Sequence, residues 1–298
     1  MKVLRTIQAL RKARKELKGS VGLVPTMGYL HEGHRSLMAL AKERTDHVIT
    51  SIFVNPKQFG PNEDLDAYPR DEKGDLQSCE EEGVSLVFLP SPEEIYPPGF
   101  STEVKVQLLG DALCGASRPG HFEGVATVVT KLFHLTTPDL AIFGQKDYQQ
   151  AAIINRLVRD LHLPIEVITA PTVREEDGLA MSSRNRYLRP EERLRAVALS
   201  QALTAAHWAY HKEGLRDPQA FIAMAQTFID ASHAGEIDYI NCVNPSTIQP
   251  LKDIPSLEKE GAVMAIAVKV GTARLIDNLR LDHPLPPGLS YESLGLLP

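Results

Sequence analysis

The sequence is poor in the features that mark zinc-binding, secreted and membrane-spanning proteins. Its three cysteines, Cys79, Cys114 and Cys242, lie far apart without CxxC spacing, which favours reduced structural thiols over a zinc site. The chain has no apolar run of about 18 residues, so no membrane-spanning helix is expected. The N-terminal stretch Met1–Thr6 lacks the unbroken apolar core of a signal peptide. These absences predict a cytoplasmic protein with no membrane partner.

Basic residues are also too few and too scattered for a nucleic-acid-binding surface. The 32 lysines and arginines against 38 aspartates and glutamates give a formal net charge of −6. Proteins that bind nucleic acid usually carry a basic face or a long basic run. The densest basic cluster, Arg11–Lys15, is predicted to be a solvated helix face. We therefore expect no nucleic-acid partner.

The apolar content of the chain is sufficient for two folded domains. Of its 298 residues 43% are hydrophobic and 23% charged, and this length exceeds the usual size of a single domain. Buried strands alternate with helices up to about residue 170, which is typical of an α/β domain with a parallel sheet. Two long helices followed by strands with short turns indicate an α+β domain with an antiparallel sheet. We predict domains over residues 1–175 and 176–298, with a poorly ordered tail after Asp282.

The stretch Val21–His34 predicts a phosphate-binding site near the N-terminus. It consists of a short buried strand, a Pro/Gly break and two histidines, and a helical run follows it. The first backbone N–H groups of a helix and its dipole favour an anion at such a turn. Gly28 and Gly33 would let the backbone approach a ligand closely. His31 and His34 would lie beside the ligand as hydrogen-bond donors.

A second strand, His47–Val54, ends at an Asn-Pro pair and completes a strand–helix–strand unit. Ligands of such units bind at the carboxyl ends of the strands, so Gln58 is expected at the edge of the same crevice. From its position alone, Gln58 could equally be a solvated loop residue. The acidic stretch 63–66 could attract Mg²⁺, although such loops are more often simply solvated.

Two later stretches add polar side chains that suit phosphates. Gly144–Gln150 repeats the order of strand, glycine, polar turn and helix, and Lys146 is a compact cation for a polyphosphate. Asp147 could cap the helix or hold a ribose hydroxyl, and Gln150 could face the crevice. Met181–Arg186 offers two hydroxyls and an arginine beside the hinge-like Gly178, which suits a mobile phosphate flap.

Taken together, five stretches resemble the pantothenate synthetase (pantoate–β-alanine ligase) family, whose members are nucleotidyltransferases with an HxGH motif on a Rossmann-like fold. In chain order these are Pro25–His34, Phe53–Gly60, Arg118–Val125, Phe143–Gln150 and Met181–Asn185. The HxGH motif alone is shared by many enzymes, but the Asn-Pro-x-Gln-Phe and Lys-Asp-Tyr-Gln-Gln stretches make the resemblance specific. It covers residues 1 to about 282 and implies a Rossmann-like parallel-sheet domain followed by a small α+β lid domain.

The resemblance implies an ATP-dependent reaction in two steps. The carboxylate of pantoate attacks the α-phosphorus of ATP to give pantoyl adenylate and pyrophosphate, and the amine of β-alanine then displaces AMP. The implied cofactor is ATP with Mg²⁺. The implied assembly is a cytosolic homodimer in which the small domain closes over the site.

The resemblance also assigns the site residues. His31, His34 and Lys146 would be catalytic by stabilising charge on the phosphates, with His34 as the proton donor. Gln58 and Gln150 would hold pantoate, and Gln58 would also lie near β-alanine. The residues that would contact ATP are Met27, Gly28, Tyr29, Leu30, His31, Glu32, Gly33, His34, Gly144, Gln145, Lys146, Asp147, Val173, Met181, Ser182, Ser183 and Arg184. For Arg118, His121 and the acids at 63–66, loop order, a dimer contact and chemistry all stay open.

Two other functions are compatible with parts of the sequence. A nucleotidylyltransferase that keeps its nucleotidyl product would use the same HxGH chemistry, but it gives no reason for two substrate-facing glutamines. A nucleotide-binding regulator without catalysis would not need both histidines and Lys146. The length and the acidic balance disfavour a tRNA-charging enzyme.

Overall fold

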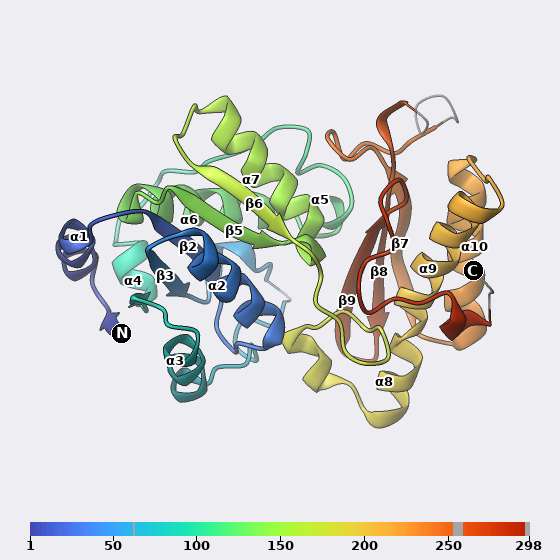
Figure 1. The fold of residues 1–298 in the computed structure, drawn as a ribbon, viewed down its shortest axis with the longest axis horizontal. Helices are drawn as coiled ribbons and strands as arrows, with labels where there is room; N and C mark the ends of the chain where they lie inside the picture. Colours follow the sequence, from blue (N-terminus) through green and yellow to red (C-terminus); the bar gives the residue numbers. More distant parts are fainter. Residues whose placement is uncertain (62, 253–258, 296–298) are drawn as a thin grey trace. The chain divides into compact units, whose positions relative to one another are not determined.

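The computed structural model of the protein describes residues 1–61, 63–252 and 259–295. They divide into two compact units (Figure 1). The first comprises Met1–Gly144 and Ile153–Ala170, and the second comprises Gln145–Ala152 and the chain from Pro171 onward. The short segment after Gly144 thus groups with the C-terminal unit. The domain boundary expected near residue 175 stays a prediction.

The first unit is built on a six-stranded, all-parallel sheet in the order β1-β4-β3-β2-β5-β6. The strands are β1 (Lys2–Leu4), β2 (Val21–Thr26), β3 (His47–Ile52), β4 (Leu86–Phe88), β5 (Leu140–Gly144) and β6 (Glu166–Ala170). The helices are α1 (Ile7–Glu16), α2 (Glu32–Arg44), η1 (Pro56–Gln58), α3 (Glu72–Glu81), α4 (Pro92–Ile95), α5 (Cys114–Ser117), α6 (His121–Thr136) and, from Ile153 on, α7 (Tyr148–Asp160). The predicted α/β class with a parallel sheet is confirmed.

The apolar runs of the sequence become the central strands of this sheet. Val24, Val48 and Ile142 are fully buried, because helices cover a parallel sheet and leave its central strands no polar face. Helix α2 packs on them through Met38 and Ala41, which are also fully buried. This packing places the start of α2 beside the carboxyl end of β2.

Two predictions for the first unit are wrong. The periodicity of residues 3–18 predicts a single helix, but β1 precedes α1 and pairs with β4 at the edge of the sheet. A three-residue strand is too short to show a period. The alternating run Thr102–Leu108 predicts an edge strand, yet it forms none. The N–H group of Val104 donates instead to Oγ1 of Thr127, at 2.9 Å.

The second unit contains the antiparallel sheet that the sequence predicts, in the order β7-β8-β9. Figure 1 shows α9 and α10 along one side of it. Its elements are η2 (Gln145–Asp147), the start of α7 (Tyr148–Asp160), η3 (Ser183–Tyr187), α8 (Pro190–Ala196), α9 (Ala198–Lys212), α10 (Pro218–Ser232), β7 (Glu236–Val243), β8 (Val263–Val270), β9 (Ala273–Arg280) and η4 (Glu292–Leu294). Both η2 and η3 pack against β9. No helix within the described ranges is long and apolar enough to cross a membrane.

The tail after Asp282 differs from the expectation of poor order over residues 283–295. Its Tyr291 hydroxyl lies 2.7 Å from Nδ1 of His207, and the carbonyl of His283 lies 2.7 Å from Nε2 of the same ring. Leu285 and Leu289 pack against the core of the second unit. The few apolar residues of the tail therefore find partners in that core, which composition alone does not reveal. Residues 296–298 lie outside the described residues.

A buried ion pair ties β9 to the segment that enters the second unit. Arg174 donates to both carboxylate oxygens of Asp277, at 2.6 and 2.9 Å, and both side chains are 1% exposed. The guanidinium also donates to the carbonyl of Gly178, at 3.0 Å. Removing one member of such a pair leaves the other charge buried without its partner.

We expect Asp277→Ala to lower the free energy of unfolding of the second unit by about 3–5 kcal/mol. The matched control is Asp238→Ala, which breaks the more exposed Arg274–Asp238 pair on the same sheet and should change that free energy by about 0–1 kcal/mol. Urea unfolding followed by the fluorescence of Trp208 measures both, because this single tryptophan lies in α9. Equal, small losses in the two variants would contradict the prediction.

Candidate functional site

The turn after β2 is held by a carboxylate from α3. Asp75 is 3% exposed and accepts the backbone N–H groups of Tyr29 and Leu30 at 2.9 and 2.7 Å. Burial raises the pKa of Asp75, although these two bonds oppose the rise. Gly28 has a φ of +85°, and a Cβ there would lie 2.9 Å from Oδ2 of Asp75. Glycine is therefore needed at this position to make room for Asp75, a different reason from the predicted approach of a ligand.

The two histidines form the N-terminal cap of α2. His31 is the N-cap residue, and its Nδ1 accepts the N–H of Gly33 at 3.1 Å. Nδ1 of His34, at the third helical position, faces the N–H of His31 at 3.3 Å. The sequence predicts that the helix follows the two histidines; instead His31 caps the helix and His34 lies in its first turn. Because Nδ1 of each neutral ring accepts, the proton lies on Nε2 of both.

The paired rings suit an anionic ligand. Their centroids lie 4.1 Å apart, so two Nε2–H donors lie within one helical turn. They lie at the end of α2 where the first backbone N–H groups and the helix dipole already favour negative charge. This arrangement can bind phosphate and stabilise charge that develops on it during a reaction.

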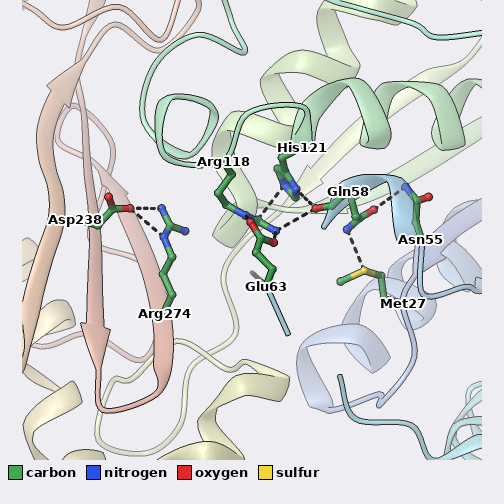
Figure 2. A network of polar contacts seen from close by, with 8 residues as sticks. All are labelled: Met27, Asn55, Gln58, Glu63, Arg118, His121, Asp238 and Arg274. Carbon is green, nitrogen blue, oxygen red and sulfur yellow. Dashed lines mark hydrogen bonds and ion pairs between the residues drawn. The ribbon is translucent and has the colours of Figure 1, made fainter. Parts of the chain in front are cut away.

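Gln58 is buried and its side chain is oriented by neighbours. It is 8% exposed, so the alternative of a solvated loop residue is excluded. Oε1 of Gln58 accepts from Nδ2 of Asn55 at 3.1 Å, and Nε2 of Gln58 faces Sδ of Met27 at 2.9 Å (Figure 2). The hydroxyl of Tyr96 donates to Oδ1 of Asn55 at 2.7 Å, which fixes the asparagine amide in turn. Gln58 and the turn that leads to His31 thus lie together in the first unit.

In the second unit, Asn278 of β9 holds the turn that carries Lys146. Its Nδ2 donates to the carbonyls of Gln145 and Lys146, both at 2.9 Å, and the residue is 3% exposed. Nζ of Lys146 lies 3.5 Å from a carboxylate oxygen of Asp147. The lysine side chain is 21% exposed, so it remains accessible to a ligand.

The predicted flap is a short 3-10 helix in the same unit. Oγ of Ser182 accepts the N–H of Arg184 at 3.3 Å and caps η3, which packs against β9. The backbone of Met181 donates to the carbonyl of Val173 at 3.0 Å, so these two predicted residues are neighbours. Strand β9 therefore supports both predicted phosphate-binding segments of this unit. Gln150 lies in the first turns of α7 and is half-buried.

Sequence reasoning missed the residues that hold these segments. Asp75 comes from a helix without a motif, and nothing in its local sequence marks its partners. Asn278 offered a clearer signal, since Asp277 and Asn278 interrupt an apolar strand with two polar residues. Asn55 lies inside the matched stretch Phe53–Gly60, but the Asn-Pro pair by itself indicates only the end of a strand. No group of three or more His, Cys, Asp or Glu among the described residues could hold a metal ion.

Comparisons with known proteins agree with the motifs. The model of the pantoate–β-alanine ligase family matches residues 2–280. A pantothenate synthetase of Thermoanaerobacter sp. (strain X514) is 52% identical over 276 residues, covering 92% of this chain and 96% of that protein. The family match thus includes all five motif stretches and most of both units.

Solved structures give the same result. Pantothenate synthetase from Thermus thermophilus is 46% identical with a TM-score of 0.88, covering 94% of this chain and 99% of the other. The pantoate–β-alanine ligase from Francisella tularensis, complexed with β-γ ATP and β-alanine, is 33% identical with a TM-score of 0.78, covering 95% of this chain and 98% of the other. The resemblance inferred from the sequence is confirmed, and the chain belongs to the pantoate–β-alanine ligase family.

Proposed function

We propose that the protein condenses pantoate with β-alanine in an ATP-dependent reaction that passes through pantoyl adenylate. The observation that carries the proposal is the pair of histidines at the N-terminus of α2, whose Nδ1 atoms face backbone N–H groups and thereby leave Nε2 of each adjacent ring as the donor. Family membership and the relative complexed with β-γ ATP and β-alanine support the choice of substrates.

In the first step a pantoate carboxylate oxygen bonds to the α-phosphorus of ATP, and the bond from that phosphorus to the bridging oxygen breaks, releasing pyrophosphate. Negative charge grows on the phosphate oxygens as this happens. His31, His34 and Lys146 would stabilise it, and such preorganised donors typically contribute about 2.7–4 kcal/mol each. The remaining residues of Met27–His34, Gly144–Asp147, Val173 and Met181–Arg184 would bind the nucleotide.

In the second step the amine of β-alanine attacks the acyl carbon of pantoyl adenylate. The bond to AMP breaks, the amine nitrogen loses a proton, and pantothenate forms. Gln58 and Gln150 would hold pantoate, with Gln58 also near the amine. Neutral amides bind hydroxyls and carboxylates without competing as nucleophiles. The bonds from Asn55 and to Met27 support this role, because they orient the Gln58 amide before substrate arrives.

Further parts of the proposal rest on the family resemblance. Mg²⁺ would be held by ATP phosphates and water, as is usual for this ion. Glu63 of the acidic stretch is paired with Arg118, so we assign the ion no ligand there. We also propose a homodimer and closure of the second unit as a lid. We also propose a cytoplasmic location, which is supported by three buried cysteines that form no disulfide within the described residues. Burial raises the pKa of two of these thiols, Cys79 and Cys242, to about 12, so both stay protonated and unreactive.

The decisive experiment is pantoate-dependent exchange of labelled pyrophosphate into ATP, followed by AMP release on addition of β-alanine. We expect exchange only with pantoate and AMP release only with both substrates. A nucleotidylyltransferase that keeps its product would show no AMP release whether or not β-alanine is added, and a regulator would show no exchange. Either result would refute the ligase function.

His34 should be needed for adenylate formation beyond its place in the helix cap. We expect both His34→Gln and His34→Ala to slow pyrophosphate exchange by about 100- to 1000-fold, since neither side chain can transfer a proton to the phosphates as an imidazole can. Glutamine at the third helical position can still accept the N–H of His31. Only His34→Ala should therefore lose about 0.5–2 kcal/mol of stability. Rapid exchange by His34→Gln would show that the imidazole is structural.

Asn278 should matter for nucleotide binding because it holds the backbone of the Lys146 turn. We expect Asn278→Ala to raise the KM for ATP and to lower stability by about 1–3 kcal/mol, since two carbonyls lose their donor. Asn241→Ala is the matched control, because Asn241 and Asn278 pair with the same residue, Ala265, from opposite sides. Equal KM values for ATP in the two variants would contradict the prediction.

A further inference from the structure

The stretch Arg118–Gly124 converges on η1, the short helix that ends at Gln58 (Figure 2). Nδ1 of His121 lies 2.7 Å from the main-chain oxygen of Gln58, and Nη2 of Arg118 lies 3.2 Å from the same atom. We propose that Arg118 and His121 are positioning residues that hold the Gln58 backbone so that its amide meets the acid and amine substrates. The inference rests on the proposed function, which assigns Gln58 to these substrates.

The hydrogen bonds of His121 define one tautomer. A carbonyl oxygen only accepts, so Nδ1 carries the proton that it donates to Gln58. Nε2 lies 3.1 Å from Nη1 of Arg118, and because a guanidinium only donates, Nε2 accepts. A neutral ring with its proton on Nδ1 satisfies both contacts. His121 therefore acts as a fixed donor to the Gln58 carbonyl and does not transfer protons in the reaction.

Arg118 is itself held by Glu63. Its Nε and Nη2 donate to the two carboxylate oxygens at 2.8 and 2.5 Å, a bidentate arrangement that fixes the guanidinium plane. Burial acts to raise the pKa of Glu63, but the hydrogen bonds and charge of Arg118 outweigh it and lower that pKa. The carboxylate thus stays ionised and keeps the arginine oriented toward Gln58. This gives a purpose to one acid of the 63–66 stretch.

The first turn of α6 also contacts η1 through Gly124. A Cβ on Gly124 would lie 2.2 Å from the carbonyl oxygen of Lys57, so only glycine allows this approach. The carbonyl of Gly124 accepts from Nδ2 of Asn55 at 3.1 Å, and the same amide donates to Oε1 of Gln58. The motif therefore fixes both the backbone and the side chain of Gln58. Fewer contacts would be enough to order a loop, so we infer that these contacts serve to place Gln58.

The test measures the KM values for pantoate, β-alanine and ATP together with the melting temperature. We expect His121→Ala to raise the first two KM values by about 10- to 100-fold, the penalty for a displaced substrate-binding group. The KM for ATP and the melting temperature should stay near wild type. His121→Asn should restore binding, because its amide nitrogen takes the place of Nδ1. His134→Ala, an exposed histidine of the same helix, is the matched control.

The outcomes separate this inference from the proposed function. Absence of ligation by the wild type refutes the function and with it the inference. Ligation by the wild type with unchanged pantoate and β-alanine KM values in His121→Ala overturns the inference alone, as does failure of His121→Asn to restore binding. If His121→Ala does not fold, Glu63→Ala decides, because it removes both acceptors that orient the Arg118 guanidinium while leaving α6 unchanged. Wild-type KM values in that variant overturn the inference.

Discussion

The backbone groups that lack sheet or helix partners where β2 ends are the constraint on which the candidate site depends. A parallel strand that stops before a helix leaves N–H groups that neither the sheet ladder nor the helix can satisfy. Asp75 accepts two of them, from Tyr29 and Leu30. With this carboxylate in place the chain can turn through Gly28 and begin α2 at His31. The orientation of both histidines therefore follows from a residue on a different helix.

At the other turns, too, a side chain from a distant part of the chain binds the backbone. It is an acceptor where the backbone offers N–H groups and a donor where the backbone offers carbonyls. Backbone N–H groups outside the sheet and helix ladders donate to a carboxylate, whereas backbone carbonyls outside them accept from side-chain donors. These donors are His121 and Arg118 at Gln58, and Asn278 at Lys146. Because side chains from elsewhere in the chain bind the backbone of each turn, the turns do not depend on His34, Gln58 and Lys146 alone for their stability. They can be used for substrates, with little reorganisation on binding.

The sequence was sufficient for the parts of the fold that depend on apolar periodicity. The strands ending at Thr26, Ile52 and Gly144 are buried runs, and the glycines and prolines after them mark the turns. It was insufficient where a structure depends on a partner distant in the chain. The strand β1 exists because β4 pairs with it, and Asp75 is separated by more than 40 residues from the turn it binds. Local pattern contains no information about such contacts, so the supporting residues had to come from the structure.

The histidine cap shows how function and stability compete at one position. Histidine is absent from the residues preferred at an N-cap, where Ser, Thr, Asp and Asn bind the free N–H groups better. A small capping residue, however, would reach only the helix backbone. An imidazole caps with Nδ1 and has a second ring nitrogen, Nε2, that can donate, so one side chain can serve the helix and a ligand together. The weaker cap therefore follows from the need for two donors at the start of α2. The phosphates of ATP would impose this need.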